Sequence, residues 1–295
     1  TKGPVTVPVL IPECSHRPEY FAVSGAAVMG YGFPVVELLR KHLPHDLRDA
    51  AQMNRTLTEF FEDERGSLPP GALTIRTLNN HDTVCSDGRA QYRFGAGLAR
   101  ALYAVCLSVP GVPMMYQEEE VGQFFELQQL NWARRSLVEL CDGDADYRAV
   151  NFAPEVFTVL RTDHRHSTIC LVNLSGNRVE TMATVSLRDG TVLNDAVSGA
   201  AAYVGEGCFW WTLEAYGAAF LRVGGLPDTT PPPLAFSGEP ATVETVLSAF
   251  RIEPHADGLR VKMGGVVAEL GMDGVSWQTN DTGVGTFTLR SCNGE

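Results

Sequence analysis

In the first half of the chain, apolar runs of strand length alternate with segments whose apolar residues recur at helical spacing. Strands are predicted over residues 5–11, 26–31, 73–78 and 112–116. Helices are predicted over 35–43, where Pro34 precedes an amphipathic run, and over 52–65, 90–107 and 131–141. Four strand–helix units in succession predict a parallel βα architecture over residues 1–146.

The pattern changes after residue 146, where short β-like runs are separated by turn signals such as Ser175-Gly176-Asn177. These runs predict an antiparallel β-sandwich over residues 147–224. Residues 225–240 contain three successive prolines, which is typical of a stiff, extended linker. A small, Gly-rich β module is predicted over 241–295, and it could be truncated. The fold class is therefore α/β followed by all-β.

The composition argues against two classes of partner, nucleic acids and membranes, but does not identify a function. The 295 residues allow about two domains and a small third one. A net charge of −12 argues against binding to nucleic acid, because an acidic surface repels phosphate. No apolar run approaches the roughly 18–20 residues that a membrane helix needs, so no membrane partner is expected.

The seven cysteines are widely spaced and include no Cys-x-x-Cys pair. This arrangement predicts neither a disulfide framework nor a zinc site. We expect most of the cysteines to be small core residues, and their presence as free thiols favours a cytoplasmic location.

The strongest local signal is Asn80-His81-Asp82, which follows the predicted strand 73–78. In parallel βα barrels, catalytic groups gather at the carboxyl ends of strands. A carboxylate beside a His and an Asn could orient hydroxyl groups and stabilise positive charge. The alternative is that the motif is a polar turn that caps the next helix, with Asp as the cap.

Glu13 occupies a similar place, because it follows the predicted strand 5–11. Cleavage of a glycosidic bond needs at least two carboxyl groups, such as two on neighbouring strand ends. One group donates a proton and another stabilises a cationic sugar. Taken alone, Glu13 reads as an ordinary loop carboxylate. Its pairing with Asp82 is what makes it a candidate catalytic residue.

Two motifs in order resemble the alpha-amylase family, glycoside hydrolase family 13. Asn80-His81-Asp82-Thr83 is similar to the motif at the family's seventh barrel strand, and residues 110–122 (PGVPMMYQEEEVG) resemble its eighth strand and loop. The resemblance continues to about residue 224, since the family follows its barrel with an antiparallel β domain. It implies that residues 1–146 are the second half, strands 5–8, of a TIM-type (β/α)8 barrel.

The resemblance also implies roles for individual residues. Asp82 would stabilise the transition state, Glu13 would be the general acid/base, and His81, Asn80 and Tyr116 would bind sugar. The implied activity is a glycoside hydrolase or transglycosylase acting on α-glucosidic bonds by a retaining mechanism. The implied partner is an α-glucan or α-glucoside. No cofactor is implied, and although structural calcium occurs in the family, no metal site is identified here.

Some positions depart from the family's pattern. Pro12 precedes Glu13 where the family more usually has Gly, and Glu118 replaces the usual Gly of the eighth-strand loop. No Arg follows Thr83 closely, and Arg89 and Arg93 are the nearest substitutes.

The family's nucleophilic Asp, at the end of the fourth strand, has no counterpart here, because only twelve residues precede Glu13. A complete barrel takes about 250 residues and eight strands. We therefore expect this chain to be a fragment, inactive alone, that folds with a missing N-terminal barrel half from the same precursor or a second chain. The alternative is a non-catalytic alpha-amylase-like binding or scaffold subunit.

Three further features carry weaker expectations. Trp210 and Trp211 are adjacent in a predicted strand, so one ring should point outward and the other inward. His164 and His166 flank Arg165 and are predicted to lie in a solvated loop. The acidic run 118–120 is expected to be exposed, where it could reach a substrate or calcium.

Overall fold

The computed structural model describes residues 29–30, 33–46, 49–68, 73–116, 119 and 124–227, and five strands between residues 250 and 287. The chain forms two compact units, Thr1–Thr229 and Thr230–Glu295. The predicted strand 5–11, Glu13, and the predicted linker from residue 228 to residue 240 lie outside the described residues.

A small parallel sheet lies at the start of the first unit. Its strands are β1 Met29–Gly30, β2 Leu73–Arg76 and β3 Val112–Pro113, in the order β1-β2-β3. β2 pairs with β3 in parallel, with Ile75 opposite Val112. Helices connect the strands, so the predicted βα alternation is present, while the half-barrel arrangement stays a prediction.

The helices that the sequence pattern predicted for this unit lie where it predicted them, but two of the predicted helices are each split into two shorter ones. The helices after β1 are α2 Phe33–Asp46 and α3 Ala50–Ser67; those after β2 are α4 His81–Asp87, α5 Ala90–Phe94 and α6 Ala96–Ser108. The single helix predicted over 90–107 was wrong, because Gly95 adopts φ +79°, which ends α5 and starts α6. Likewise, α7 Phe124–Ser136 and α8 Val138–Asp142 replace the helix predicted over 131–141. None of the described helices is long and apolar enough to span a bilayer.

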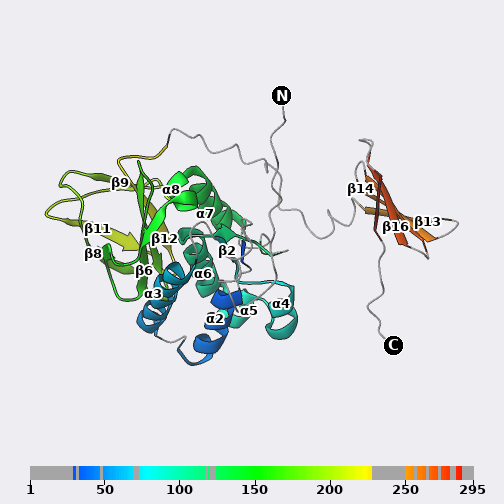
Figure 1. Cartoon of the computed structure of the whole chain (residues 1–295), viewed down its shortest axis with the longest axis horizontal. Helices are drawn as coiled ribbons and strands as arrows, with labels where there is room; N and C mark the ends of the chain where they lie inside the picture. The colour runs from blue at the N-terminus through cyan, green and yellow to red at the C-terminus, as the bar shows by residue number, and fades with distance from the viewer. Residues whose placement is uncertain are drawn as a thin grey trace. The chain divides into compact units, whose positions relative to one another are not determined.

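Two antiparallel sheets form the sandwich (Figure 1). The six-stranded sheet has the order β10-β9-β12-β7-β6-β4, and the three-stranded sheet has the order β11-β8-β5. Their bounds are β4 Asp144–Asp146, β5 Val150–Asn151, β6 Val156–Thr162, β7 Ser167–Asn173, β8 Val179–Val185, β9 Val192–Asp195, β10 Ala201–Tyr203, β11 Cys208–Leu213 and β12 Ala218–Val223. Five of these strands coincide with the β-like runs of the sequence: β6, β7, β8, β11 and β12.

The central strands β6, β7 and β12 of the six-stranded sheet are buried on both faces, because α3 and α6 pack against them opposite the second sheet (Figure 1). Cys170 and Phe220 belong to the core shared with the helices, whereas the adjacent Leu171 and Leu221 belong to the core between the sheets. This explains the continuous apolar runs of β7 and β12. The helical layer and the sandwich are thus one compact unit, and the domain boundary predicted between residues 146 and 147 stays a prediction.

The three-stranded sheet has one solvent-facing side. Trp210 and Trp211 alternate as expected, with Trp210 56% exposed and Trp211 8% exposed. Trp211 fills the core between the sheets.

The five cysteines within the described ranges are free thiols. Burial raises the pKa of Cys106 and of Cys170 to about 12, so these two are inert core residues as predicted. Cys85 and Cys141 are exposed instead. The cytoplasmic location stays a prediction.

The second unit is an antiparallel sheet with the strands in sequence order. Its strands are β13 Phe250–His255, β14 Gly258–Met263, β15 Val266–Gly271, β16 Gly274–Thr279 and β17 Val284–Phe287. Strand-like runs in the sequence at 248–252, 258–262 and 285–289 overlap β13, β14 and β17, whereas the sequence pattern did not indicate the two strands between them.

Candidate active site

The predicted site residues of the first unit lie beyond the ends of two neighbouring parallel strands. Asn80, His81 and Asp82 follow β2, and Tyr116 follows β3. Since β2 and β3 run in the same direction, both segments leave the sheet at the same edge. The structure therefore places both segments at one edge of the sheet, and their role in a site stays a prediction.

Asn80 caps helix α4. Its Oδ1 accepts a hydrogen bond from the Thr83 N–H at 2.8 Å, and its own N–H donates to Thr83 Oγ1 at 3.0 Å. This reciprocal pair satisfies two backbone donors that a helix start leaves free. The motif therefore caps the next helix, as the alternative interpretation held, but the cap is Asn80 and the expectation that Asp is the cap was wrong. Asp82 lies in the first turn.

His81 and Asp82 stand at the surface of this helix start. Their side chains are 61% and 57% exposed, and His81 Nε2 lies 3.5 Å from Asp82 Oδ1. An exposed carboxylate held on a capped helix can accept hydrogen bonds from hydroxyl groups or face a developing positive charge. The imidazole beside it can donate to or accept from a hydroxyl group.

Glu119, the described member of the acidic run, is buried, so the prediction of an exposed run is wrong for this residue. The residue is 8% exposed, and its Oε2 accepts hydrogen bonds from the Tyr116 N–H at 2.6 Å and the Tyr103 hydroxyl at 3.0 Å. Its Oε1 accepts from Asn79 Nδ2. Burial raises the pKa of Glu119, against the opposing effect of these donors.

Asn79 completes the connection between the two strand ends. Its Oδ1 accepts from the Ala90 N–H at 2.8 Å, while its amide nitrogen bonds Glu119. Because Asn79 immediately precedes Asn80, the segment after β3 is tied through Glu119 to the segment that carries His81 and Asp82. Sequence reasoning missed this link.

The two arginines that follow the motif also support it. Arg93 donates to the Leu78 carbonyl oxygen at 3.0 Å, and the Arg89 guanidinium lies 5.5 Å from the centre of the Tyr116 ring. Tyr116 is half-buried under Arg89. Glu13 lies outside the described residues, so its pairing with Asp82 stays a prediction.

We expect the Glu119→Gln variant to lose stability relative to the wild type most strongly in mild acid. The pKa of Glu119 is raised in the folded protein above its ordinary value of 4.5, mainly by burial. Protonation of Glu119 therefore favours folding. This contribution is fully present below that ordinary pKa and is lost as the pH rises through the folded pKa. Urea unfolding of both proteins from mildly acidic to neutral pH measures the difference.

The stability gap between wild type and Glu119→Gln should shrink as the pH rises, because the variant lacks the titrating group. Exposed Glu59, on α3, provides the matched control, since Glu59→Gln should change stability little at any pH. A gap that widens toward neutral pH would contradict the raised pKa.

Comparison with solved structures identifies proteins of similar fold. An alpha-amylase from Geobacillus thermoleovorans matches with a TM-score of 0.56 at 16% identity, covering 75% of this chain and 54% of that protein. A noncanonic maltogenic alpha-amylase from Thermotoga neapolitana matches at 0.55 and 15% identity, covering 72% and 54%. An alpha-amylase from Anoxybacillus matches at 0.52 and 16% identity, covering 69% and 53%.

Sequence comparison adds no relative. No protein-family model matches the sequence, and no curated protein matches it. The chain spans about half the length of the alpha-amylases that it matches in structure. The resemblance predicted from the sequence motifs is thus confirmed in three dimensions: this chain has the fold of part of an alpha-amylase.

Proposed function

We propose that this chain forms part of a site that cleaves or transfers α-glucosidic bonds by a retaining mechanism. The observation that carries the proposal is the exposed pair of His81 and Asp82 at the end of β2, beside Tyr116 at the end of β3, in a fold similar to alpha-amylases. The Glu119 network holds the two strand ends together. The exposed carboxylate and imidazole at this edge can both hydrogen-bond hydroxyl groups, which suits a polyhydroxylated substrate.

The proposed chemistry divides between three groups. Glu13 protonates the leaving glycosidic oxygen and later deprotonates the water or acceptor sugar, while a carboxylate nucleophile holds the sugar in between. Asp82 stabilises the oxocarbenium-like transition state through its negative charge. His81 binds sugar hydroxyls. The nucleophile would come from barrel strands beyond this chain, in the same precursor or a second polypeptide, so this chain alone would be inactive.

Asn80 receives a different role from the one that the family resemblance implied. Asn80 is 1% exposed, and its Oδ1 accepts the capping hydrogen bond from the Thr83 N–H. We therefore expect Asn80 to position His81 and Asp82 and not to contact the sugar. Tyr116 remains a candidate for sugar contact, since it is half-buried at the same edge.

An α-glucan or α-glucoside is the proposed substrate. The Geobacillus thermoleovorans alpha-amylase was crystallised with acarbose, and another structurally similar protein was crystallised with maltotriose. The latter covers 74% of this chain at a TM-score of 0.51. Maltotriose is therefore a suitable first probe.

The test uses this chain assembled with the polypeptide that supplies the remaining barrel strands. We expect the assembly to convert maltotriose, and the first product seen by proton NMR should be the α-anomer, as retention requires. The separate chain should show no turnover. A β-anomer as first product would contradict the retaining mechanism, and maltotriose binding without turnover would favour the non-catalytic binding subunit.

A further inference from the structure

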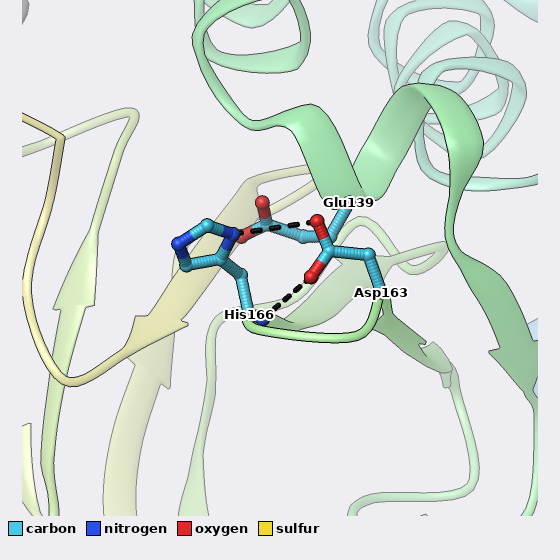
Figure 2. Close-up of side chains that lie close together, drawn as sticks. All are labelled: Glu139, Asp163 and His166. Carbon is cyan, nitrogen blue, oxygen red and sulfur yellow. Dashed lines mark hydrogen bonds and ion pairs between the residues drawn. The ribbon is translucent and has the colours of Figure 1, made fainter.

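A second cluster of ligating side chains lies far along the chain from the candidate active site. It consists of Glu139 on the short helix α8, and Asp163 and His166 on the hairpin between β6 and β7 (Figure 2). One ligand atom from each of the three residues lies within 4.8 Å of the other two. The cluster joins the helical layer to the sandwich.

Asp163 is oriented by the backbone of its own hairpin. Its Oδ1 accepts hydrogen bonds from the N–H groups of Arg165 at 2.7 Å and His166 at 2.6 Å. Its Oδ2 lies 3.3 Å from His166 Nδ1 (Figure 2). One oxygen is therefore fixed by the turn, and the other is turned toward the imidazole.

Glu139 is held in the same way from a different side. Its Oε1 accepts a hydrogen bond from Thr168 Oγ1 at 2.6 Å and lies 3.2 Å from Arg222 Nε. Glu139 is 0% exposed, and its Oε2 has no hydrogen-bond partner within the described part of the chain. A buried carboxylate oxygen without a hydrogen-bond partner is costly, so a cation bound there would offset that cost.

We propose that Glu139, Asp163 and His166 bind a divalent transition-metal cation of the Zn²⁺ class through Glu139 Oε2, Asp163 Oδ2 and His166 Nδ1. Zinc commonly takes three such protein ligands with water in the fourth position. With bonds of about 2.0–2.1 Å, the ligands of a tetrahedral ion lie roughly 3.3 Å apart. The spacing of Asp163 Oδ2 and His166 Nδ1, 3.3 Å, already matches this value, and a carboxylate oxygen of Glu139 lies within 4.8 Å of the other two ligand atoms.

The surroundings fit a dication in two further respects. Each carboxylate has one oxygen engaged by an orienting donor, which is how outer partners fix metal ligands. With a neutral imidazole, the two carboxylates outweigh the single charge of Arg222, so a cation would find net negative charge. The imidazole nitrogen favours Zn²⁺, Ni²⁺ or Co²⁺ over Ca²⁺ and Mg²⁺, which prefer oxygen ligands.

This site has a structural consequence that is independent of glycoside chemistry. An ion shared by α8 and the β6–β7 hairpin would crosslink the helical layer to the six-stranded sheet. The unfolded chain does not hold the three ligands together, so the metal binds only the folded protein. Such selective binding raises the apparent stability of the fold.

The test measures Zn²⁺ binding to the full chain after chelator treatment. Isothermal titration should show one site whose affinity falls by about tenfold or more in His166→Gln and in Asp163→Asn, each of which loses one ligand. Asn at 163 keeps an Oδ1 acceptor for the two backbone N–H groups, so the hairpin should fold. The matched control is His164→Gln, in the same hairpin but exposed, which should bind as the wild type does.

A thermal shift gives the second readout. Zn²⁺ should raise the Tm of wild type and His164→Gln but not of His166→Gln. Thr168→Val, which removes the donor to Glu139 Oε1, should weaken Zn²⁺ binding by roughly 10-fold. Equal Zn²⁺ binding by the His164→Gln and His166→Gln variants, as zinc held by cysteines would give, overturns the proposal. So does a site that takes Ca²⁺ or Mg²⁺ but not Zn²⁺.

Discussion

Replacing Asp82 with Asn is expected to lower kcat for maltotriose cleavage by about 100-fold or more in the assembled enzyme, with little change in fold. The substitution keeps the size of the side chain but removes the negative charge that would face the oxocarbenium-like transition state. Since Asp82 is exposed, its loss leaves no buried group unpaired. Steady-state kinetics with maltotriose measure the effect.

The matched control is Ser86→Ala in the same helix, which should keep the kcat of the wild type. Ser86 is exposed, and within the described part of the chain its hydroxyl donates to the Thr83 carbonyl oxygen at 3.5 Å. Circular dichroism should show the same helix content in both variants. If Asp82→Asn turned over maltotriose as fast as Ser86→Ala, Asp82 would not be the stabilising carboxylate.

Asn80→Ala separates a positioning role from contact with the substrate. Loss of the cap should cost about 1 kcal/mol of stability and loosen the start of α4. Asn80→Ser keeps a capping oxygen, so it should restore the kcat that Asn80→Ala loses. If Ser failed to rescue the rate, Asn80 would act by touching the sugar.

The parts of the site that the sequence predicted depend on local pattern. The apolar run of β2 and the polar motif directly after it are adjacent in sequence, so a strand end with polar residues could be read from residues 73–82. The capping box is also local, because Asn80 and Thr83 are three positions apart. Parallel pairing then follows from the βα alternation.

The parts that the sequence did not predict depend on distant partners. Three successive glutamates give no periodic signal of burial, and Glu119 is buried where Asn79 and Tyr103 donate hydrogen bonds to its carboxylate. Tyr103 lies on α6, in a run that reads simply as a core helix. A search for a buried acceptor opposite the polar motif would have found Glu119 only once the strand order was known.

The cluster of Glu139, Asp163 and His166 is hidden from the sequence for the same reason. Its members share no ligand spacing that a motif describes, and the hairpin reads as solvated. His166 is turned toward Asp163 by the turn that Asp163 itself caps. His164, two positions earlier, stays exposed.

Buried arginines hold the corner between α6 and β3. Arg134 donates to the Gly111 carbonyl oxygen at 2.6 Å, Arg161 donates to the Ser108 carbonyl oxygen at 2.9 Å, and Arg76 donates to that of Pro110 at 2.7 Å. Burial lowers the pKa of Arg134 to about 10. These guanidinium groups satisfy carbonyl oxygens that the irregular corner leaves without helix or sheet partners.

Replacing Arg76 with Met is expected to lower the free energy of unfolding by about 3 kcal/mol. The Arg76 side chain is 2% exposed, binds both oxygens of Glu64, and lies 5.2 Å from the centre of the Phe61 ring. Met fills much of the volume but leaves the Glu64 carboxylate, only 13% exposed, without its cation. Urea unfolding of the full chain, followed by circular dichroism, measures the loss.

The control is the more exposed ion pair of Arg148 and Glu62, in which Glu62 lies two residues before Glu64 on helix α3. Because that pair is solvated, Arg148→Met should cost about 0.5 kcal/mol or less. Adding Glu64→Gln to Arg76→Met should recover part of the stability, since the unpaired charge is then removed. If Arg76→Met and Arg148→Met lowered the free energy of unfolding equally, the buried pair of Arg76 and Glu64 would not stabilise the corner more than an exposed pair does. Water would then have to replace the hydrogen bond from Arg76 to the Pro110 carbonyl oxygen.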